Sequence, residues 1–252
     1  MTAADPLMLS GDGTAAVVTG AATGIGRHLA TALAERGVPV TALDADERTL
    51  RAWAEGAGGV HPVGCDVTDE PAVVAALDEA QERSGPVALV VTCAAIADHV
   101  GADEITVEHF RRTLDVNVTG SFVVARAAAR LMRHTGGGSI VLVGSQLGRV
   151  TQPGRAAYST SKAAVEMLAK VLALDLAGWG VRVNCLAPGP VLTDRTRGRL
   201  LGEDRERSGD RMLVGRYLEP EDLVGAVAYL ASPASAGTTG STLLVDGGYS
   251  VV

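Results

Sequence analysis

The sequence predicts an α/β fold in which a parallel sheet carries helices on both of its faces. Short runs of β-branched residues alternate with longer amphipathic stretches rich in alanine and leucine, a pattern typical of parallel sheets. The run 87–91 is apolar at every position, as expected of a strand covered on both faces. No linker or internal repeat divides the 252 residues, which suits a single domain.

Seven strands are expected, each a short run dominated by valine, leucine, isoleucine or threonine. In chain order they span residues 15–19, 38–43, 60–64, 87–92, 139–144, 181–187 and 241–245.

Six helices are expected in the longer amphipathic stretches between the strands. The first begins directly after a glycine-rich turn, and Pro220 opens the last. In chain order they span residues 24–36, 46–55, 69–83, 107–134, 155–177 and 220–231. Strands and helices that alternate in this way predict a Rossmann-type, doubly wound sheet of seven parallel strands.

The segment 194–215 interrupts this alternation. It is dense in charge, with six arginines among five acidic residues, and it separates the sixth strand from the last helix. Because it is too long for a simple connection, it is interpreted as a substrate lid or an insertion with short helices.

Composition excludes several classes of function. The net charge of −7 and the pI near 5.2 argue against binding to nucleic acid or to an anionic membrane. The three cysteines form no C-x-x-C pair, so they fit reduced thiols rather than disulfides or a zinc site, and no metal is expected. The start of the chain lacks a secretory pattern, and the apolar stretch 87–97 is too short to span a bilayer. A soluble, cytoplasmic protein is expected.

Tyr158 and Lys162 are the strongest candidates for catalysis. The chain has only two lysines, Lys162 and Lys170, and arginine supplies the rest of its positive charge. A lysine kept in this composition suggests a need for a compact ammonium, which arginine cannot replace. On a helix, residues four positions apart share a face. The pair therefore predicts a tyrosine acid/base assisted by a lysine.

A glycine-rich turn follows the first strand. Gly20, Gly24 and Gly26 form a G-x-x-x-G-x-G pattern that lets the backbone turn tightly and approach a pyrophosphate. The helix that follows offers free N–H groups and its positive dipole end to the phosphates. In this position, between a strand and a helix, the turn predicts a dinucleotide site.

Two aspartates follow the second and third strands. Asp44 is placed to accept both hydroxyls of an adenosine ribose and to repel a 2′-phosphate, or else to cap the helix that begins near Asp46. This favours NAD as the cofactor, with NADP the less favoured alternative. Asp66 is placed either to accept from the adenine amino group or to form a turn.

Ser145 follows the fifth strand, at an edge where open α/β sheets keep their sites. A serine there is often only a turn former. With Tyr158 and Lys162 it would bind and protonate a carbonyl oxygen. Since the pKa of tyrosine is ordinarily about 10, a nearby cation is expected to lower it.

Taken together, these residues resemble the short-chain dehydrogenase/reductase family over essentially the whole chain. The resemblance implies that Ser145 orients the substrate oxygen, that Tyr158 exchanges the proton, and that Lys162 also holds the nicotinamide ribose. It implies that Asn117 anchors a water in a proton relay. The cofactor residues that it implies, with those argued above, are Gly20, Thr23, Gly24, Ile25, Gly26, Asp44, Asp66, Val67, Cys93, Ala94, Ala95, Tyr158, Lys162, Pro188, Gly189, Val191 and Thr193.

One segment departs from the family pattern. Where Asn-Asn-Ala-Gly is usual after the fourth strand, this chain has Thr92-Cys93-Ala94-Ala95. Cys93 lacks the hydrogen-bonding groups of asparagine, and Ala95 adds a methyl group. We expect an effect on cofactor affinity or on the following loop, and Cys93 is interpreted as a buried small residue rather than a reactive thiol.

The resemblance implies an oxidoreductase that interconverts a secondary alcohol and a ketone, assembled as a homotetramer, with a dimer as the second alternative. By position, the substrate pocket draws on residues 96–99, Gln146, Leu147, Gln152, Pro190 and the lid. Arginines of the lid either clamp an anionic substrate or pair with neighbouring acids. Two alternatives stay open: a redox sensor or scaffold without turnover, and an enzyme acting on an imine or a carbon–carbon double bond.

Overall fold

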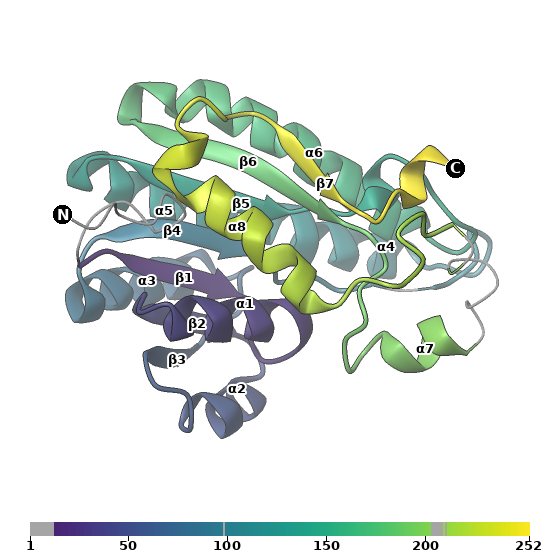
Figure 1. Cartoon of the computed structure of the whole chain (residues 1–252), viewed down its shortest axis with the longest axis horizontal. Coiled ribbons are helices and arrows are strands. Elements are labelled where there is room, and N and C mark those ends of the chain that lie inside the picture. The colour runs from purple at the N-terminus through teal and green to yellow at the C-terminus, as the bar shows by residue number, and fades with distance from the viewer. Residues whose placement is uncertain (1–12, 98, 203–208, 210) are drawn as a thin grey trace.

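The structure is a computed structural model that describes residues 13–97, 99–202, 209 and 211–252. Its centre is a seven-stranded sheet in the order β3-β2-β1-β4-β5-β6-β7, and every neighbouring pair of strands is parallel. Helices cover both faces of the sheet (Figure 1). The predicted doubly wound, single-domain fold is confirmed.

All seven predicted strands are present, three of them with the predicted bounds. The second begins two residues later than predicted, after Pro39, which has no backbone N–H to offer a neighbouring strand. Pro62 lies inside β3, which is tolerated because β3 is an edge strand. The strands are β1 Ala15–Thr19, β2 Val40–Asp44, β3 Val60–Gly64, β4 Val87–Thr92, β5 Gly138–Val143, β6 Val181–Pro188 and β7 Thr242–Val245.

The helices divide between two hydrophobic cores, one on each face of the sheet. Helices α1, α2 and α8 supply Leu29, Leu50 and Leu230 to one core, and α3, α5 and α6 supply residues such as Leu77 and Met132 to the other. The helices are α1 Gly24–Glu35, α2 Glu47–Ala54, α3 Glu70–Ser84, α4 Val107–Leu114, α5 Ser121–Thr135, α6 Ala156–Leu176, α7 Arg197–Leu201 and α8 Val224–Ala231. None of the described helices has the length and apolar character needed to cross a bilayer.

Residues 107–134 are helical, as predicted, but not α-helical throughout. The turn Asp115–Gly120 is π-helical and separates α4 from α5. Within it, the Asn117 side chain bonds to the backbone of Ile96, and the Ser121 hydroxyl donates to the carbonyl of Asn117 at 2.8 Å. Gly120 leaves room for Val67, because a Cβ there would lie 2.6 Å from a Val67 methyl carbon. These contacts to neighbouring segments explain the wider turn.

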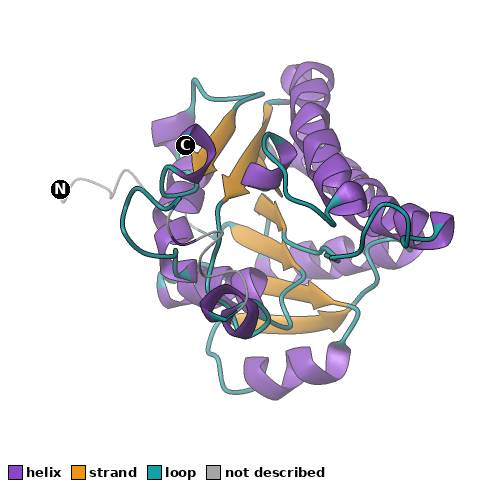
Figure 2. Ribbon diagram, turned by 90° about the vertical axis from the view of Figure 1, so that its right-hand side faces the viewer, coloured by secondary structure: helices purple, strands orange, loops and turns teal. Residues whose placement is uncertain are grey.

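The strand order reverses between β1 and β4. From β1 the chain builds β2 and β3 on one side of the sheet and then crosses to β4 on the other. Such a reversal opens a crevice at the carboxyl ends of the strands, where ligands bind in open α/β sheets. Figure 2 views the molecule from the side toward which the strands point in Figure 1.

The segment 194–215 contains α7, which projects beyond this end of the sheet (Figure 1). One short helix is thus present, as predicted for this segment. Residues 203–208 and 210 lie outside the described part of the chain. The segment returns to the sheet through the bridge between Val191 and Leu218, in which the Leu192 N–H donates to the Leu218 carbonyl at 2.7 Å.

Candidate active site

The carboxyl ends of the strands enclose a cleft of about 590 Å³. All of the predicted site residues except Asn117 line it: Gly20, Thr23, Gly24, Ile25, Gly26, Asp44, Asp66, Val67, Cys93, Ala94, Ala95, Ser145, Tyr158, Lys162, Pro188, Gly189, Val191 and Thr193.

The glycine turn at one end of the cleft is packed against other backbone. Gly20 has φ +65°, and a Cβ there would lie 2.5 Å from the nitrogen of Ala94. A Cβ on Gly26 would lie 2.2 Å from the carbonyl oxygen of Gly20. Thr23 is the N-cap of α1 and makes no capping bond through its side chain within the described chain. The N–H groups of the first turn of α1 therefore stay available to phosphate oxygens.

Asp44 stands at the end of β2 with its carboxylate held in place. The Ala22 N–H donates to its Oδ2 and the Asp46 N–H to its Oδ1, both at 2.9 Å. The cap of α2 is Asp46, whose side chain accepts from the Thr49 N–H at 3.1 Å. Hydrogen bonds from the Thr49 hydroxyl and N–H hold the pKa of Asp46 below its usual range. Asp44 is thus not the helix cap, and two carboxylates face this part of the cleft.

Asp66 forms a turn after β3. Its Oδ1 accepts from the N–H of Thr68 at 2.9 Å and from the Thr68 hydroxyl at 2.8 Å. These bonds, that from the N–H first, hold the pKa of Asp66 below its usual range. Arg112 on α4 places a guanidinium nitrogen 3.7 Å from Asp66 Oδ2. The hydrogen bonds of Asp66 are therefore those expected of a turn-forming residue. Asp66 also lines the cleft.

The unusual segment after β4 lies between the glycine turn and Lys162. The Ala94 N–H donates to the Thr19 hydroxyl at 3.2 Å, which joins the segment to β1. Cys93 packs against the core. Burial raises the pKa of Cys93 to about 12, although Lys162 acts in the opposite direction. Since the thiolate is the nucleophile, this shift disfavours a reactive thiol. The residue is only half-buried, however, and it lines the cleft.

Ser145, Tyr158 and Lys162 line the same cleft. Ser145 follows β5, and its hydroxyl accepts from the Leu147 N–H at 3.1 Å, which orients it at the start of the 3₁₀ turn Gln146–Gly148. Lys162 is only 3% exposed and donates from Nζ to the Val143 carbonyl at 2.8 Å. The same Nζ lies 5.7 Å from the ring centroid of Tyr158. A buried ammonium thus stands beside the tyrosine, as the sequence predicts.

Asn117 is fully buried behind this group rather than in the cleft. Its Oδ1 accepts from the Ile96 N–H at 2.9 Å, and its Nδ2 donates to the Ile96 carbonyl at 3.0 Å and to the Ser161 hydroxyl at 2.9 Å. The amide therefore clamps the segment after β4 to α6, next to Lys162. Its role in a water relay stays a prediction.

Another part of the cleft wall is built from the segment after β6, and a Cβ on Gly24 would lie 3.6 Å from the methyl carbon of Thr193. A Cβ on Gly189 would lie 2.6 Å from the Cα of Asp246, so this glycine allows close packing against the C-terminal segment. Thr193 bonds to the Thr196 hydroxyl through its own hydroxyl at 2.9 Å. These contacts fix the segment after β6, in which the family resemblance assigns Gly189, Val191 and Thr193 to the cofactor.

Known proteins resemble this chain over its whole described length. A family model described as enoyl-(acyl carrier protein) reductase matches residues 20–250. A solved short-chain type dehydrogenase/reductase from Mycobacterium marinum is 36% identical, with a TM-score of 0.91 over 98% of this chain and 99% of that one. The chain belongs to the short-chain dehydrogenase/reductase family.

Two further relatives of this short-chain dehydrogenase/reductase are specific enzymes. Galactitol 2-dehydrogenase (L-tagatose-forming) of Cereibacter sphaeroides is 40% identical over 95% of this chain and 96% of its own. Gluconate 5-dehydrogenase of Burkholderia cenocepacia, solved with NADP and tartrate, is 33% identical, with a TM-score of 0.90 over 98% of both chains. This short-chain dehydrogenase/reductase is an oxidoreductase that uses NAD or NADP and interconverts a secondary alcohol and a ketone.

Sequence reasoning missed several residues that line the cleft of this dehydrogenase/reductase. Arg155 could have been found, because it lies three residues before Tyr158 at the start of α6. Arg112 could not, since α4 reaches the cleft through tertiary packing. The residues missed are Ala22, Ala45, Asp46, Cys65, Arg112, Val116, Val143, Gly144, Arg155 and the backbone around them.

Proposed function

We propose that this protein is an NAD-dependent dehydrogenase of a secondary alcohol in which Tyr158 transfers the proton. The observation that carries the choice of NAD is the Asp44 carboxylate, held by two backbone N–H groups at the wall of the cleft. A bound NAD would supply the acceptor for the hydride that leaves the alcohol carbon. Residues of the chain would transfer the proton, orient the substrate and bind the cofactor.

Proton transfer is assigned to Tyr158. In oxidation its deprotonated oxygen takes the proton of the substrate alcohol, and in reduction the resulting hydroxyl gives the proton to the carbonyl oxygen. Lys162 stabilises the negative charge on the tyrosine oxygen. Its buried ammonium is held beside the Tyr158 ring by a hydrogen bond to the Val143 carbonyl. Ser145 donates a hydrogen bond to the substrate oxygen from a fixed position after β5. Asn117 acts through Lys162 by holding α6 in place.

The glycine turn and the strand ends would hold the dinucleotide. Gly20, Gly24 and Gly26 bring backbone close to the pyrophosphate without a Cβ in the way, and the first turn of α1 supplies N–H donors. Asp44, Asp66 and Val67 would bind the adenosine half of the dinucleotide, and the segment from Pro188 to Thr193 would bind its nicotinamide half. Cys93, Ala94 and Ala95 would contact the cofactor between these two regions.

The carboxylates at the end of β2 favour NAD over NADP. An NAD ribose offers two hydroxyl donors to Asp44, whereas the 2′-phosphate of NADP would meet two like charges, those of Asp44 and Asp46. The gluconate 5-dehydrogenase relative was solved with NADP, so cofactor choice varies among similar chains. The preference must therefore follow from residues of this chain.

We expect Asp44→Ala to reduce the preference for NAD over NADP by roughly 10–100-fold, since hydrogen bonds to a charged group contribute about 1.5–3 kcal/mol. The measurement is kcat/KM for both cofactors with the best substrate of a mixed panel of secondary alcohols. Asp69→Ala is the matched control, because Asp69 caps α3 outside the cleft and its loss should leave the ratio unchanged. A wild-type preference for NADP would contradict the assignment of Asp44.

The same panel tests the reaction itself. Oxidation of secondary alcohols with formation of NADH supports the proposal. A product with a reduced alkene and an intact carbonyl would favour the carbon–carbon double bond alternative. Tight binding of NADH with no turnover across the panel would favour the redox sensor.

We also propose a homotetramer that works in the cytoplasm. Met167, Val171 and Leu174 are 56%, 45% and 80% exposed along one face of α6, at the spacing of a helical stripe. An apolar stripe of this kind fits a helix that packs against the same helix of a second copy. We expect light scattering at micromolar concentration to give four times the mass of the chain. A monomeric mass would contradict the assembly.

A further inference from the structure

Trp53 lies on α2 and is not among the described residues that line the cleft, but its indole reaches the glycine turn. We propose that Trp53 is a positioning residue, which favours NAD by holding the peptide group between Ala21 and Ala22 against the Asp44 carboxylate. The inference rests on the proposed function, since it names a further residue that determines the choice of dinucleotide at the same site.

This peptide group is held at both of its ends. Its carbonyl, that of Ala21, accepts from Trp53 Nε1 at 3.1 Å. Its N–H, that of Ala22, donates to Asp44 Oδ2 at 2.9 Å. Because a trans peptide group is planar, its carbonyl and its N–H point in opposite directions and rotate together. The bond to Trp53 therefore fixes the direction in which the Ala22 N–H meets the carboxylate.

The peptide group is buried, so its hydrogen bonds are not easily replaced by water. Ala21 is fully buried and Ala22 is only 3% exposed. The Ala21 N–H donates to the Leu43 carbonyl of β2 at 3.1 Å, which joins this part of the turn to β2 as well as to α2. Buried carbonyls nearly always have a donor. If the indole N–H is removed, we expect the peptide group to rotate toward another donor and its bond to Asp44 to weaken.

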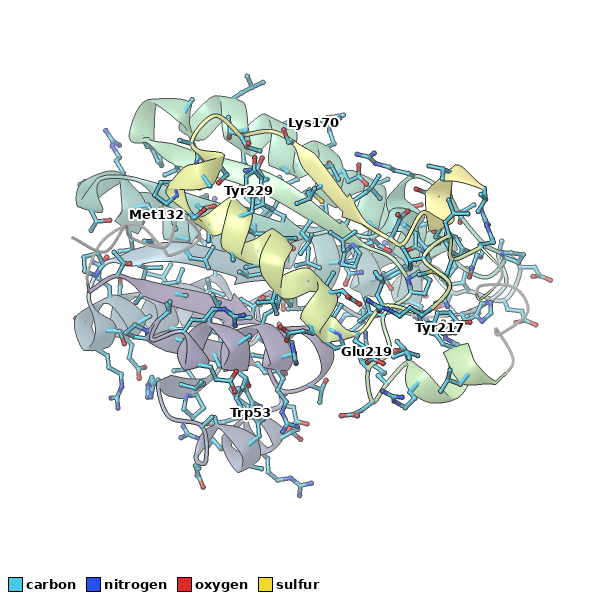
Figure 3. All side chains as sticks on the ribbon, in the orientation of Figure 1. Trp53, Met132, Lys170, Tyr217, Glu219 and Tyr229 are labelled. Carbon is cyan, nitrogen blue, oxygen red and sulfur yellow. The ribbon has the colours of Figure 1, made fainter. Side chains whose placement is uncertain are left out.

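The indole is itself held from two sides. Its half-buried ring packs against the core that contains Leu50, which lies about one turn earlier in α2. The guanidinium carbon of Arg27, near the start of α1, lies 5.4 Å from the ring centroid. Figure 3 labels Trp53 at α2. Trp53 therefore links α2 to the glycine turn and to the helix that follows this turn.

Helix α2 thus acts on both oxygens of the Asp44 carboxylate. At the beginning of the helix, the Asp46 N–H donates to Oδ1 at 2.9 Å, and near its end Trp53 acts on Oδ2 through Ala22. An ionised carboxylate has about four acceptor positions, so these two N–H groups leave positions for the two hydroxyls of an NAD ribose. The remaining positions keep a fixed direction only while both oxygens are held. A loosened carboxylate should bind the NAD ribose less tightly.

The test is the direct binding of NADH and NADPH to Trp53→Phe, followed by the fluorescence of the reduced nicotinamide. Phenylalanine keeps an aromatic ring for packing and lacks the N–H donor. We expect the dissociation constant of NADH to rise by roughly 3–10-fold, the range of a single hydrogen bond, with less than about 2-fold change for NADPH. At saturating NAD, kcat for alcohol oxidation should stay within about 2-fold of the wild type.

A double variant shows whether Trp53 acts through Asp44. In Asp44→Ala the carboxylate is absent, so adding Trp53→Phe should leave the ratio of the NADH and NADPH dissociation constants where Asp44→Ala alone puts it. A purely structural role would lower Tm and weaken both dinucleotides in either background, without changing the ratio.

Trp179→Phe is the matched control. The chain has two tryptophans, and Trp179, in the 3₁₀ turn Ala177–Trp179, packs against the other hydrophobic core from the one that contains Ala21. Its ring also lies beside an arginine, since the guanidinium carbon of Arg133 is 4.9 Å from the centroid. The substitution removes an indole with the same kind of neighbour, away from the glycine turn. Both dissociation constants should stay unchanged.

An unchanged ratio in Trp53→Phe, where Asp44→Ala does change it, would overturn the inference and leave the proposed choice of NAD standing. Equal weakening of both dinucleotides, or the same shift in the Asp44→Ala background, would also overturn it. A wild type that binds NADPH more tightly than NADH would count against the proposed function. The dependence of the Trp53→Phe shift on Asp44 then still decides the inference.

A second measurement needs no substitution at Trp53 and covers the case in which Trp53→Phe fails to fold. Trp179→Phe leaves a single indole N–H signal in the NMR spectrum, that of Trp53. Exchange of this proton with water that slows when NADH binds, and slows less with NADPH, supports the inference. Exchange that NADH leaves unchanged overturns it.

Discussion

Tyr158→Phe should lower kcat for alcohol oxidation by roughly 100-fold or more while leaving the affinity for NADH nearly unchanged. The substitution removes only the hydroxyl that carries the proton. The ring stays in place beside Lys162, whose Nζ is held by the Val143 carbonyl, so the wall of the cleft keeps its shape. The measurements are steady-state kcat with NAD and the dissociation constant of NADH from its fluorescence.

Tyr229→Phe serves as the control, since it removes a hydroxyl that bonds to Thr238 outside the cleft. It should retain wild-type kcat. Full activity in Tyr158→Phe would exclude the proposed proton transfer. A loss of NADH binding as large as the loss of kcat would mean that the tyrosine holds the cofactor rather than the proton.

Gly26→Ala should abolish detectable binding of NADH at concentrations that saturate the wild type, and it should lower Tm. The new Cβ would lie 2.2 Å from the carbonyl oxygen of Gly20, and Gly20 itself is packed against the backbone of Ala94. Backbone cannot rotate aside as a flexible side chain can, so the glycine turn must open. Overpacking of this kind ordinarily costs about 1–3 kcal/mol of stability.

Gly225→Ala is the matched control for this substitution. Gly225 is the second residue of α8, and a Cβ there would have no neighbour within 4 Å. Alanine at such a helical site commonly stabilises by about 0.4–1 kcal/mol, so Tm should stay level or rise and NADH should still bind. Normal NADH binding by Gly26→Ala would contradict the role of the turn.

The sequence predicted the sheet well because buried parallel strands leave a strong local signal. The run of apolar residues in β4 and the glycine turn after β1 can each be recognised from the local sequence, without knowing which distant residues they contact. The same holds for Tyr158 and Lys162, since their spacing on one helix decides that they meet.

What the sequence could not predict depends on contacts between distant segments. The π-helical turn at Asn117 follows from bonds to Ile96 and Ser161, which no local pattern reveals. That Asp44 is not the cap of α2 became clear only from the structure, in which Asp46 caps this helix and the Asp44 carboxylate accepts from the N–H of Ala22. The bond between Gln152 and Tyr249 likewise forms only once β7 has joined the sheet.

The two lysines have opposite environments, so only one of them is accessible to chemical modification. Lys162 is enclosed in the cleft wall. Lys170, labelled on α6 in Figure 3, is exposed two turns further along that helix. Amine-selective acylating dyes therefore have a single accessible lysine among the described residues. That lysine lies between Met167 and Val171 in the sequence, beside the apolar stripe, so a dye attached there would test the proposed contact between subunits.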